Sequence, residues 1–146
     1  MEIIISHQRT DFDGLAAMVG AKKLHSEAVM VFSGKMTNNV KRYMSLYKDR
    51  ITVKTAGEID KERINRIIMV DTRVAARVGP FADLVEQDEV DVLIYDHHLG
   101  RNNPIQGAKE IIEPVGATTT ILVDKIYSQG IDITPFEATL FALGIY

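Results

Sequence analysis

The chain contains 146 residues, of which 46% are hydrophobic and 25% are charged; this composition excludes a disordered polypeptide and is typical of one globular domain. A formal net charge of −3 argues against nucleic-acid binding through the charge of the whole domain, although it is compatible with a local basic cleft. The sequence has no cysteine, which excludes a disulfide, a thiolate metal site and a thiol nucleophile.

Apolar runs and helical patterns alternate along the chain. Apolar runs predict strands at residues 2–6, 28–32, 50–55, 67–71, 90–96 and 109–113, of which 50–55 and 109–113 have the weaker patterns. Apolar residues at helical spacing predict helices at residues 13–24, 38–47, 81–87, 118–128 and 135–143, the last ended by a capping glycine, Gly144. The alternation predicts an α/β fold: a doubly wound, mainly parallel sheet with helices on both faces.

No segment of the sequence is typical of membrane insertion or export. The apolar runs are much shorter than the roughly 20 residues of a membrane span. The first residues lack the basic region and cleavage site of a signal peptide. We therefore expect a cytoplasmic protein with no membrane partner.

Polar side chains gather where three of the predicted strands end. They are His7, Asp11 and Asp13 after the first strand, Asp71 at the end of strand 67–71, and Asp96, His97 and His98 at the end of strand 90–96. Taken singly, Asp13 has a simpler role as a helix cap, His7 as a hydrogen-bonded loop residue and Asp71 as a brace for the next loop. The carboxyl ends of parallel strands share one edge, however, and carboxylates that converge there need a counter-charge.

The ligand types at this edge favour divalent cations. His7, Asp11, Asp13, Asp71 and His97 offer nitrogen and oxygen donors without sulfur, a set that suits Mn²⁺, or Mg²⁺ as the alternative, more than structural zinc. Five ligands exceed the needs of one catalytic ion. They are enough for two ions roughly 3.5–4 Å apart, the arrangement used in phosphoryl hydrolysis.

Four motifs resemble those of the DHH phosphoesterase family: "HQRTDFDGLA", "VDTR", "YDHHLG" and "GATTTIL", in the family's order across nearly the whole chain. The resemblance implies that His7 and Asp11 bind one metal, that Asp13 and His97 bind the other, and that Asp71 bridges them. It also implies catalytic roles for two further residues. Asp96 would orient a histidine, and His98 would face the substrate phosphate.

The resemblance also implies a longer protein. The family's fourth motif places a metal-binding aspartate just after a turn like Gly144-Ile145, and this sequence stops at Tyr146. The sequences of the first predicted helix and of "GKMTNNVKRYMSLY" are most similar to the N-terminal DHH domain of bacterial proteins that also contain CBS domains and a poly(A) polymerase or tRNA nucleotidyltransferase unit. We therefore expect residues 1–146 to form a single DHH domain at the N-terminus of such a chain, with the downstream domains as its partners. We also expect this sequence by itself to bind the second metal weakly. A homodimer is a further option.

Several residues are candidates for contacts with a substrate phosphate. Arg9, Arg73 and Arg101 lie in loops near the predicted site, where guanidinium groups pair well with phosphate oxygens; the simpler interpretation is that they are solvated loop residues. The helix start at Thr118 offers backbone N–H groups to an anion, unless Thr118 or Thr119 only caps its helix. Basic residues among tyrosines between positions 35 and 50 favour RNA binding, or simply form the solvated face of a helix.

Four functions are compatible with these residues. The first is a two-metal hydrolase of a nucleotide or short nucleic-acid phosphoester within a nucleotidyltransferase-like protein. The second is a non-catalytic module that senses a nucleotide or a metal, and the third is a manganese-dependent inorganic pyrophosphatase. The fourth, a purely structural domain, leaves His7, Asp11 and Asp13 unexplained.

Overall fold

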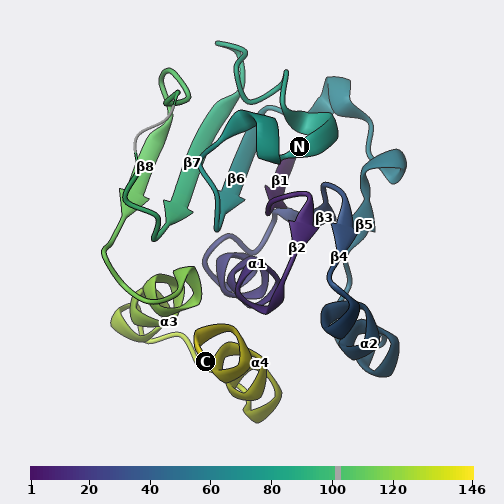
Figure 1. Cartoon of the computed structure of the whole chain (residues 1–146), viewed down its shortest axis with the longest axis vertical. Coiled ribbons are helices and arrows are strands. Elements are labelled where there is room, and N and C mark those ends of the chain that lie inside the picture. The colour runs from purple at the N-terminus through teal and green to yellow at the C-terminus, as the bar shows by residue number, and fades with distance from the viewer. Residues whose placement is uncertain (101–102) are drawn as a thin grey trace.

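A computed structural model describes residues 1–100 and 103–146 and shows an α/β fold built on one parallel sheet (Figure 1). Six strands pair in the order β5-β3-β1-β6-β7-β8, and every pair is parallel. The strands are β1 (Glu2–Ile5), β3 (Val29–Phe32), β5 (Lys54–Thr55), β6 (Arg66–Val70), β7 (Asp91–Asp96) and β8 (Lys109–Ile112). The predicted fold class is confirmed, and the predicted strand 50–55 is reduced to its last two residues.

Two helices, α1 (Phe12–Leu24) and α3 (Thr118–Ser128), pack against one face of the sheet, and α4 (Pro135–Ile145) packs on both of them (Figure 1). Helix α2 (Asn38–Tyr47) lies to the side, beyond β3. Side chains alternate across each strand, so Ile4 and Ile68 join the core under these helices. Ile3, Ile5 and Met69 join a second core on the opposite face.

Short 3-10 helices line the second face in place of a predicted α-helix: Ala56–Glu58, Lys61–Arg63, Ala75–Arg77 and Gly79–Phe81. The predicted α-helix at 81–87 is wrong. Phe81 and Val85 are both buried and four residues apart, which explains the helical pattern. The backbone bonds of this segment nevertheless mostly span three residues, as in the bond from Leu84 N–H to Phe81 O.

Gly144 does not cap its helix, because α4 continues through it to Ile145. A Cβ atom at Gly144 would lie 2.6 Å from Ala16 Cβ and 2.7 Å from Thr119 Oγ1. The glycine therefore lets α4 approach α1 and α3 closely.

The sequence did not predict a second, two-stranded parallel sheet. It pairs β2 (Arg9–Thr10) with β4 (Lys35–Met36) beyond the carboxyl ends of the main strands. Gly34 makes this pairing feasible, since any Cβ there would collide with the carbonyl oxygen of Gln8. Within the described residues, no helix combines the length and the apolar character that a membrane crossing requires.

Candidate metal centre

The candidate site lies where the winding of the sheet changes direction. From β1 the chain builds outward to β3 and β5, whereas β6, β7 and β8 extend the sheet the other way. Ligands in open α/β sheets bind beside the carboxyl ends of strands at such a switch point. His7 follows β1 and Asp71 follows β6, so both flank this point. They line a pocket of about 320 Å³ together with Asp11, Asp13, His97 and His98.

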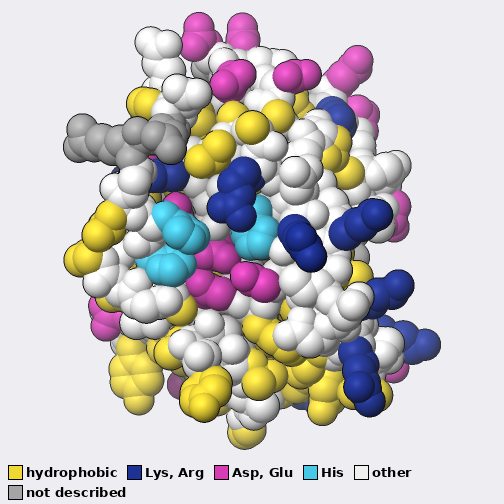
Figure 2. Space-filling view, in the orientation of Figure 1, with side chains coloured by type: hydrophobic (Ala, Val, Ile, Leu, Met, Phe, Trp, Pro, Cys, Tyr) yellow, Lys and Arg dark blue, Asp and Glu magenta, His cyan; other side chains and the backbone are white. Residues whose placement is uncertain are grey.

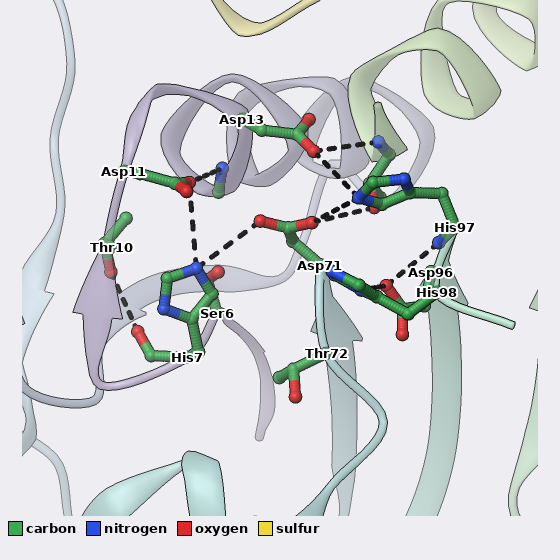
Figure 3. A network of polar contacts seen from close by, with 12 residues as sticks. Ser6, His7, Thr10, Asp11, Asp13, Asp71, Thr72, Asp96, His97 and His98 are labelled. Atoms are coloured by element: carbon green, nitrogen blue, oxygen red, sulfur yellow. Dashed lines mark hydrogen bonds and ion pairs between the residues drawn. The ribbon is translucent and has the colours of Figure 1, made fainter. Parts of the chain in front are cut away.

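The carboxylate of Asp71 lies between two histidine rings (Figure 3). Its Oδ2 is 3.4 Å from Nε2 of His7, and its Oδ1 is 3.4 Å from Nε2 of His97. The Thr118 hydroxyl donates a hydrogen bond to Oδ1 at 3.1 Å, and the Asp71 N–H donates to the Tyr95 carbonyl at 3.0 Å. Asp71 has a φ of 62°, a left-handed conformation that aspartate adopts more readily than most residues. The fold thus holds this buried carboxylate in one orientation.

Asp11 completes the group around His7. Its Oδ1 is 3.6 Å from Nε2 of His7 and also accepts a hydrogen bond from the Gly14 N–H at 2.9 Å. Asp11 is therefore the N-cap of α1, a role that the sequence analysis considered for Asp13.

Asp13 lies two residues further on, in the first turn of α1, and faces the other histidine. Its Oδ2 is 3.6 Å from Nε2 of His97. The same carboxylate accepts hydrogen bonds from the N–H groups of Thr118, at 2.9 Å, and Thr119, at 2.8 Å. Asp13 thus caps the N-terminal N–H groups of α3, which the sequence analysis considered as a binding site for an anion. No threonine side chain caps α3. Thr118 itself is fully buried, with its hydroxyl on Asp71.

The Asp96-His97-His98 triplet is fixed by its own hydrogen bonds. Asp96 Oδ1 accepts a bond from the His97 N–H at 2.9 Å and lies 2.7 Å from Nδ1 of His98. Nδ1 of His97 is 3.0 Å from the carbonyl oxygen of Val115. A carbonyl only accepts, so Nδ1 carries a proton and donates it to Val115, and this bond directs Nε2 of His97 toward Asp13 and Asp71. His98 is half exposed at the edge of the pocket.

Two groups of ligand atoms share Asp71. Among the described residues, the ligand atoms within each group lie within 4.8 Å of one another; one group is His7, Asp11 and Asp71, and the other is Asp71, Asp96, His97 and His98. Burial lowers the pKa of His7, but the carboxylates of Asp11 and Asp71 outweigh it and raise that pKa to about 9. Burial and the charge of Asp71 raise the pKa of Asp13 to about 6. The carboxylates therefore hold a proton on His7, a charge that a metal cation could replace.

The three arginines predicted to contact a substrate phosphate have different outcomes. Arg9 is exposed but lines a neighbouring groove. Arg73 is mostly buried, and its Nη1 lies 3.9 Å from Glu110 Oε2. Arg101 lies outside the described residues. Among the described residues, the arginine that lines the pocket is Arg77. Sequence reasoning missed it because the 3-10 turn at 75–77 that presents it has no apolar pattern.

Comparison with known proteins places the sequence in a family. Residues 2–145 match the DHH family, N-terminal domain. The A-adding tRNA nucleotidyltransferase of Geobacter sulfurreducens is 38% identical over 147 residues, covering 100% of this chain and 17% of that protein. The enzyme of the same name from Aquifex aeolicus is 31% identical over 148 residues, covering 99% of this chain and 16% of that protein. The chain thus spans less than a fifth of the length of these curated relatives.

Solved structures share the fold. An exopolyphosphatase-related protein from Bacteroides fragilis has a TM-score of 0.76 at 19% identity, over 98% of this chain and 44% of its own. A putative family II inorganic pyrophosphatase from Methanococcus jannaschii also has a TM-score of 0.76 at 19% identity, over 99% of this chain and 47% of its own. The exonuclease RecJ, solved with manganese, has a TM-score of 0.50 at 17% identity, over 98% and 37%. At these identities the similarity shows the fold alone, whereas the match over residues 2–145 shows that the chain belongs to the DHH family as its N-terminal domain.

Proposed function

We propose that this domain is a metal-dependent phosphoesterase that hydrolyses a phosphoester bond of a nucleotide or a short nucleic acid. The observation that supports this most directly is the position of Asp71, whose two carboxylate oxygens each face a different histidine at 3.4 Å. One side chain thereby belongs to two groups of ligands. The proposal is that one divalent cation, Mn²⁺ or Mg²⁺, binds on each side of Asp71, which bridges the two ions.

The spacing of the ligand atoms fits such ions. The four distances between histidine nitrogens and carboxylate oxygens are 3.4 and 3.6 Å, longer than good hydrogen bonds. Two ligands about 2.1 Å from a shared ion lie about 3.0–3.4 Å apart at octahedral or tetrahedral angles. The two 3.4 Å distances fall in this range, and the two 3.6 Å distances slightly exceed it. In the proposal, His7 and Asp11 hold one ion, and Asp13 and His97 hold the other.

Each part of the site has a separate task in this proposal. The bound ions would supply charge neutralisation on the phosphoryl oxygens and activation of the attacking water. Asp96 positions His98 through the 2.7 Å contact with Nδ1, so that Nε2 is the ring atom of His98 that would face a substrate phosphate; Nε2 donates a hydrogen bond there only in the doubly protonated imidazolium. Arg77, on the rim of the same pocket, supplies positive charge toward the substrate. Thr118 positions Asp71 through the hydrogen bond from its hydroxyl.

The relatives support a context in tRNA processing. Two proteins named A-adding tRNA nucleotidyltransferase match the whole chain over only 17% and 16% of their own length. We propose that the domain works at the N-terminus of such a protein in the cytoplasm, with CBS and nucleotidyltransferase domains downstream. The same observation favours a second function, in which the metal centre senses a nucleotide and regulates its neighbours without hydrolysis.

Metal titration and hydrolysis assays test the proposal together. Isothermal titration of the chain with Mn²⁺ should show two sites, and Asp71→Asn should weaken both. Asp124→Asn, a matched change at an exposed position of α3, should weaken neither. Hydrolysis of bis(p-nitrophenyl) phosphate that requires Mn²⁺ and disappears in Asp71→Asn supports the enzyme. Two bound ions without hydrolysis, in this chain and in a longer protein that contains it, favour the sensing module instead, and no metal binding overturns both functions.

A further inference from the structure

A second concave surface adjoins the metal pocket. This groove has a volume of about 700 Å³, within the range of ligand-sized pockets, and is built from the β2–β4 pair and the start of α2. Its lining residues are Gln8, Arg9, Gly34, Lys35, Met36, Thr37 and Asn38. We call it the β2–β4 groove.

The β2–β4 groove and the metal pocket share a wall. Within one short segment, His7 and Asp11 line the pocket, whereas Gln8 and Arg9 line the groove. The N–H of Gln8 donates a 2.7 Å hydrogen bond to the carbonyl oxygen of Arg77, and Arg77 also lines the metal pocket. A ligand long enough to leave the pocket past His7 would therefore meet the groove.

The groove and the helix that begins there are basic. Residues 34–48 include Lys35, Lys41, Arg42 and Lys48 and no acidic residue, although the whole chain has a net charge of −3. Arg9 and Lys35 are both exposed. Lys41 and Arg42 follow Asn38 by three and four residues, so they continue the helix face that starts in the groove. Figure 2 shows Lys and Arg side chains gathered beside the Asp and His cluster, over β2, β4 and α2.

The aromatic residues of α2 are engaged with one another. The ring centroid of Tyr43 is 5.5 Å from that of Phe12 and 4.6 Å from that of Tyr47. Tyr47 also packs on Phe136 at 5.4 Å. Stacking platforms for nucleobases need free ring faces, so this surface offers charge to phosphates more than stacking to bases.

We propose that the β2–β4 groove binds the phosphodiester backbone of a single-stranded oligonucleotide, RNA in the first instance, whose terminal phosphate enters the metal pocket. The inference rests on the proposed function and names its substrate class. A metal pocket of about 320 Å³ has room for ions and a terminal phosphoryl group, so a longer substrate needs the adjoining surface. A duplex end would have to unpair to reach the pocket. Arg9 and Lys35 contact successive phosphates, and Lys41 and Arg42 extend the track.

Fluorescence anisotropy with a labelled oligo(A) RNA of about twelve nucleotides tests this groove directly. The measurement is made in EDTA, so it depends on neither metal nor hydrolysis. The double variant Arg9→Gln/Lys35→Gln should bind about 25-fold more weakly at about 0.1 M salt, because each single-strand phosphate contact contributes about five-fold there. The salt slope should fall by about 1.4. Circular dichroism checks that this double variant, and the control variant described next, keep the fold.

A control variant separates the groove from net charge. Arg63→Gln/Lys109→Gln removes the same charge at two exposed positions near the amino ends of β6 and β8 and should bind like the wild type. Equal weakening in the two double variants overturns the inference, as does tighter binding of a duplex RNA of the same length. If DNA of the same sequence binds as tightly as the RNA, the result supports recognition of the phosphate backbone. If the DNA binds more weakly, the result supports backbone recognition together with contacts to the 2′-hydroxyl. Hydrolysis of bis(p-nitrophenyl) phosphate by the wild type is scored separately, so a failed groove and a failed phosphoesterase give different results.

Discussion

Asp13 and Thr119 join two helices whose sequences are more than a hundred residues apart. The Asp13 Oδ1 atom accepts hydrogen bonds from both the N–H of Thr119, at 2.8 Å, and its hydroxyl, at 2.7 Å. A carboxylate at a helix N-terminus is stabilised by the orphan N–H groups and by the helix dipole. The start of α3 therefore fixes the side chain that we propose as a ligand of the second ion.

Replacement of Thr119 by valine tests this link. Thr119→Val keeps the volume but removes the hydroxyl bond to a charged group, so the free energy of unfolding should fall by about 1.5–3 kcal/mol. The affinity for the second Mn²⁺ should fall as well, because Asp13 loses an orienting contact. Thr120→Val, one residue along α3, is the matched control. Urea denaturation and metal titration measure the two effects, and equal values for the two variants would contradict the link.

The packing of α4 against the same helices gives a second prediction. Gly144→Ala would place a methyl group 2.6 Å from Ala16 Cβ and 2.7 Å from Thr119 Oγ1. We expect a loss of about 1–3 kcal/mol in the free energy of unfolding, since neither neighbour is a flexible chain end. Gly57→Ala is the control, because a Cβ at Gly57 meets no atom within 4 Å. If both variants are as stable as the wild type, the close approach at Gly144 is not a tight constraint.

The edge of the sheet could be predicted because it depends on topology alone. The apolar runs before His7, Asp71 and His97 are long enough to identify buried parallel strands, and parallel strands end at one edge. The structure brings these side chains together there, within 3.4 Å in two pairs. Their roles as ligands remain a proposal.

The features that the sequence did not reveal depend on contacts between distant segments. The sequence predicts that Gly144 caps a helix, whereas the structure shows that Ala16 and Thr119 lie too close to it for a side chain. The β2–β4 pair has two residues in each strand, too few for any periodic pattern. Arg77 and Arg73 lie in one loop, and only its folded path decides that Arg77 reaches the pocket.

Metal binding should stabilise the folded chain. A cation that binds only the native state adds about 2.7 kcal/mol to the free energy of unfolding at a concentration of 100 times its Kd. Mn²⁺ should therefore raise the thermal midpoint of the wild type, and EDTA should reverse the rise. Asp71→Asn should abolish most of it, because Asp71 belongs to both ligand groups. Differential scanning fluorimetry measures the midpoints; the same rise in Asp71→Asn and in the wild type would mean that Mn²⁺ binds elsewhere.

The ion pair between α1 and α4 should make stability depend on pH in the acid range. Lys23 Nζ is 2.9 Å from Glu137 Oε2, and both side chains are mostly buried. Burial alone raises the pKa of Glu137, but the bonds from Lys23 and Thr134 outweigh it and lower that pKa below 4.5. A lowered carboxylate pKa stabilises the fold above the unfolded pKa, and this contribution disappears as the pH falls through the folded pKa.

Glu137→Gln isolates that contribution, since the glutamine carbonyl can still accept the hydrogen bond from the Thr134 N–H. At about pH 7 the variant should be less stable than the wild type by roughly 0.5–1 kcal/mol. The difference should shrink as the pH falls below about 4.5 and vanish once the pH lies below the lowered pKa of folded Glu137, where the residue is protonated in both states. Glu86→Gln, at an exposed position, is the matched control. Urea denaturation across this pH range measures the difference, and a gap between Glu137→Gln and the wild type that stays constant with pH would show that the charge of Glu137 is not its source.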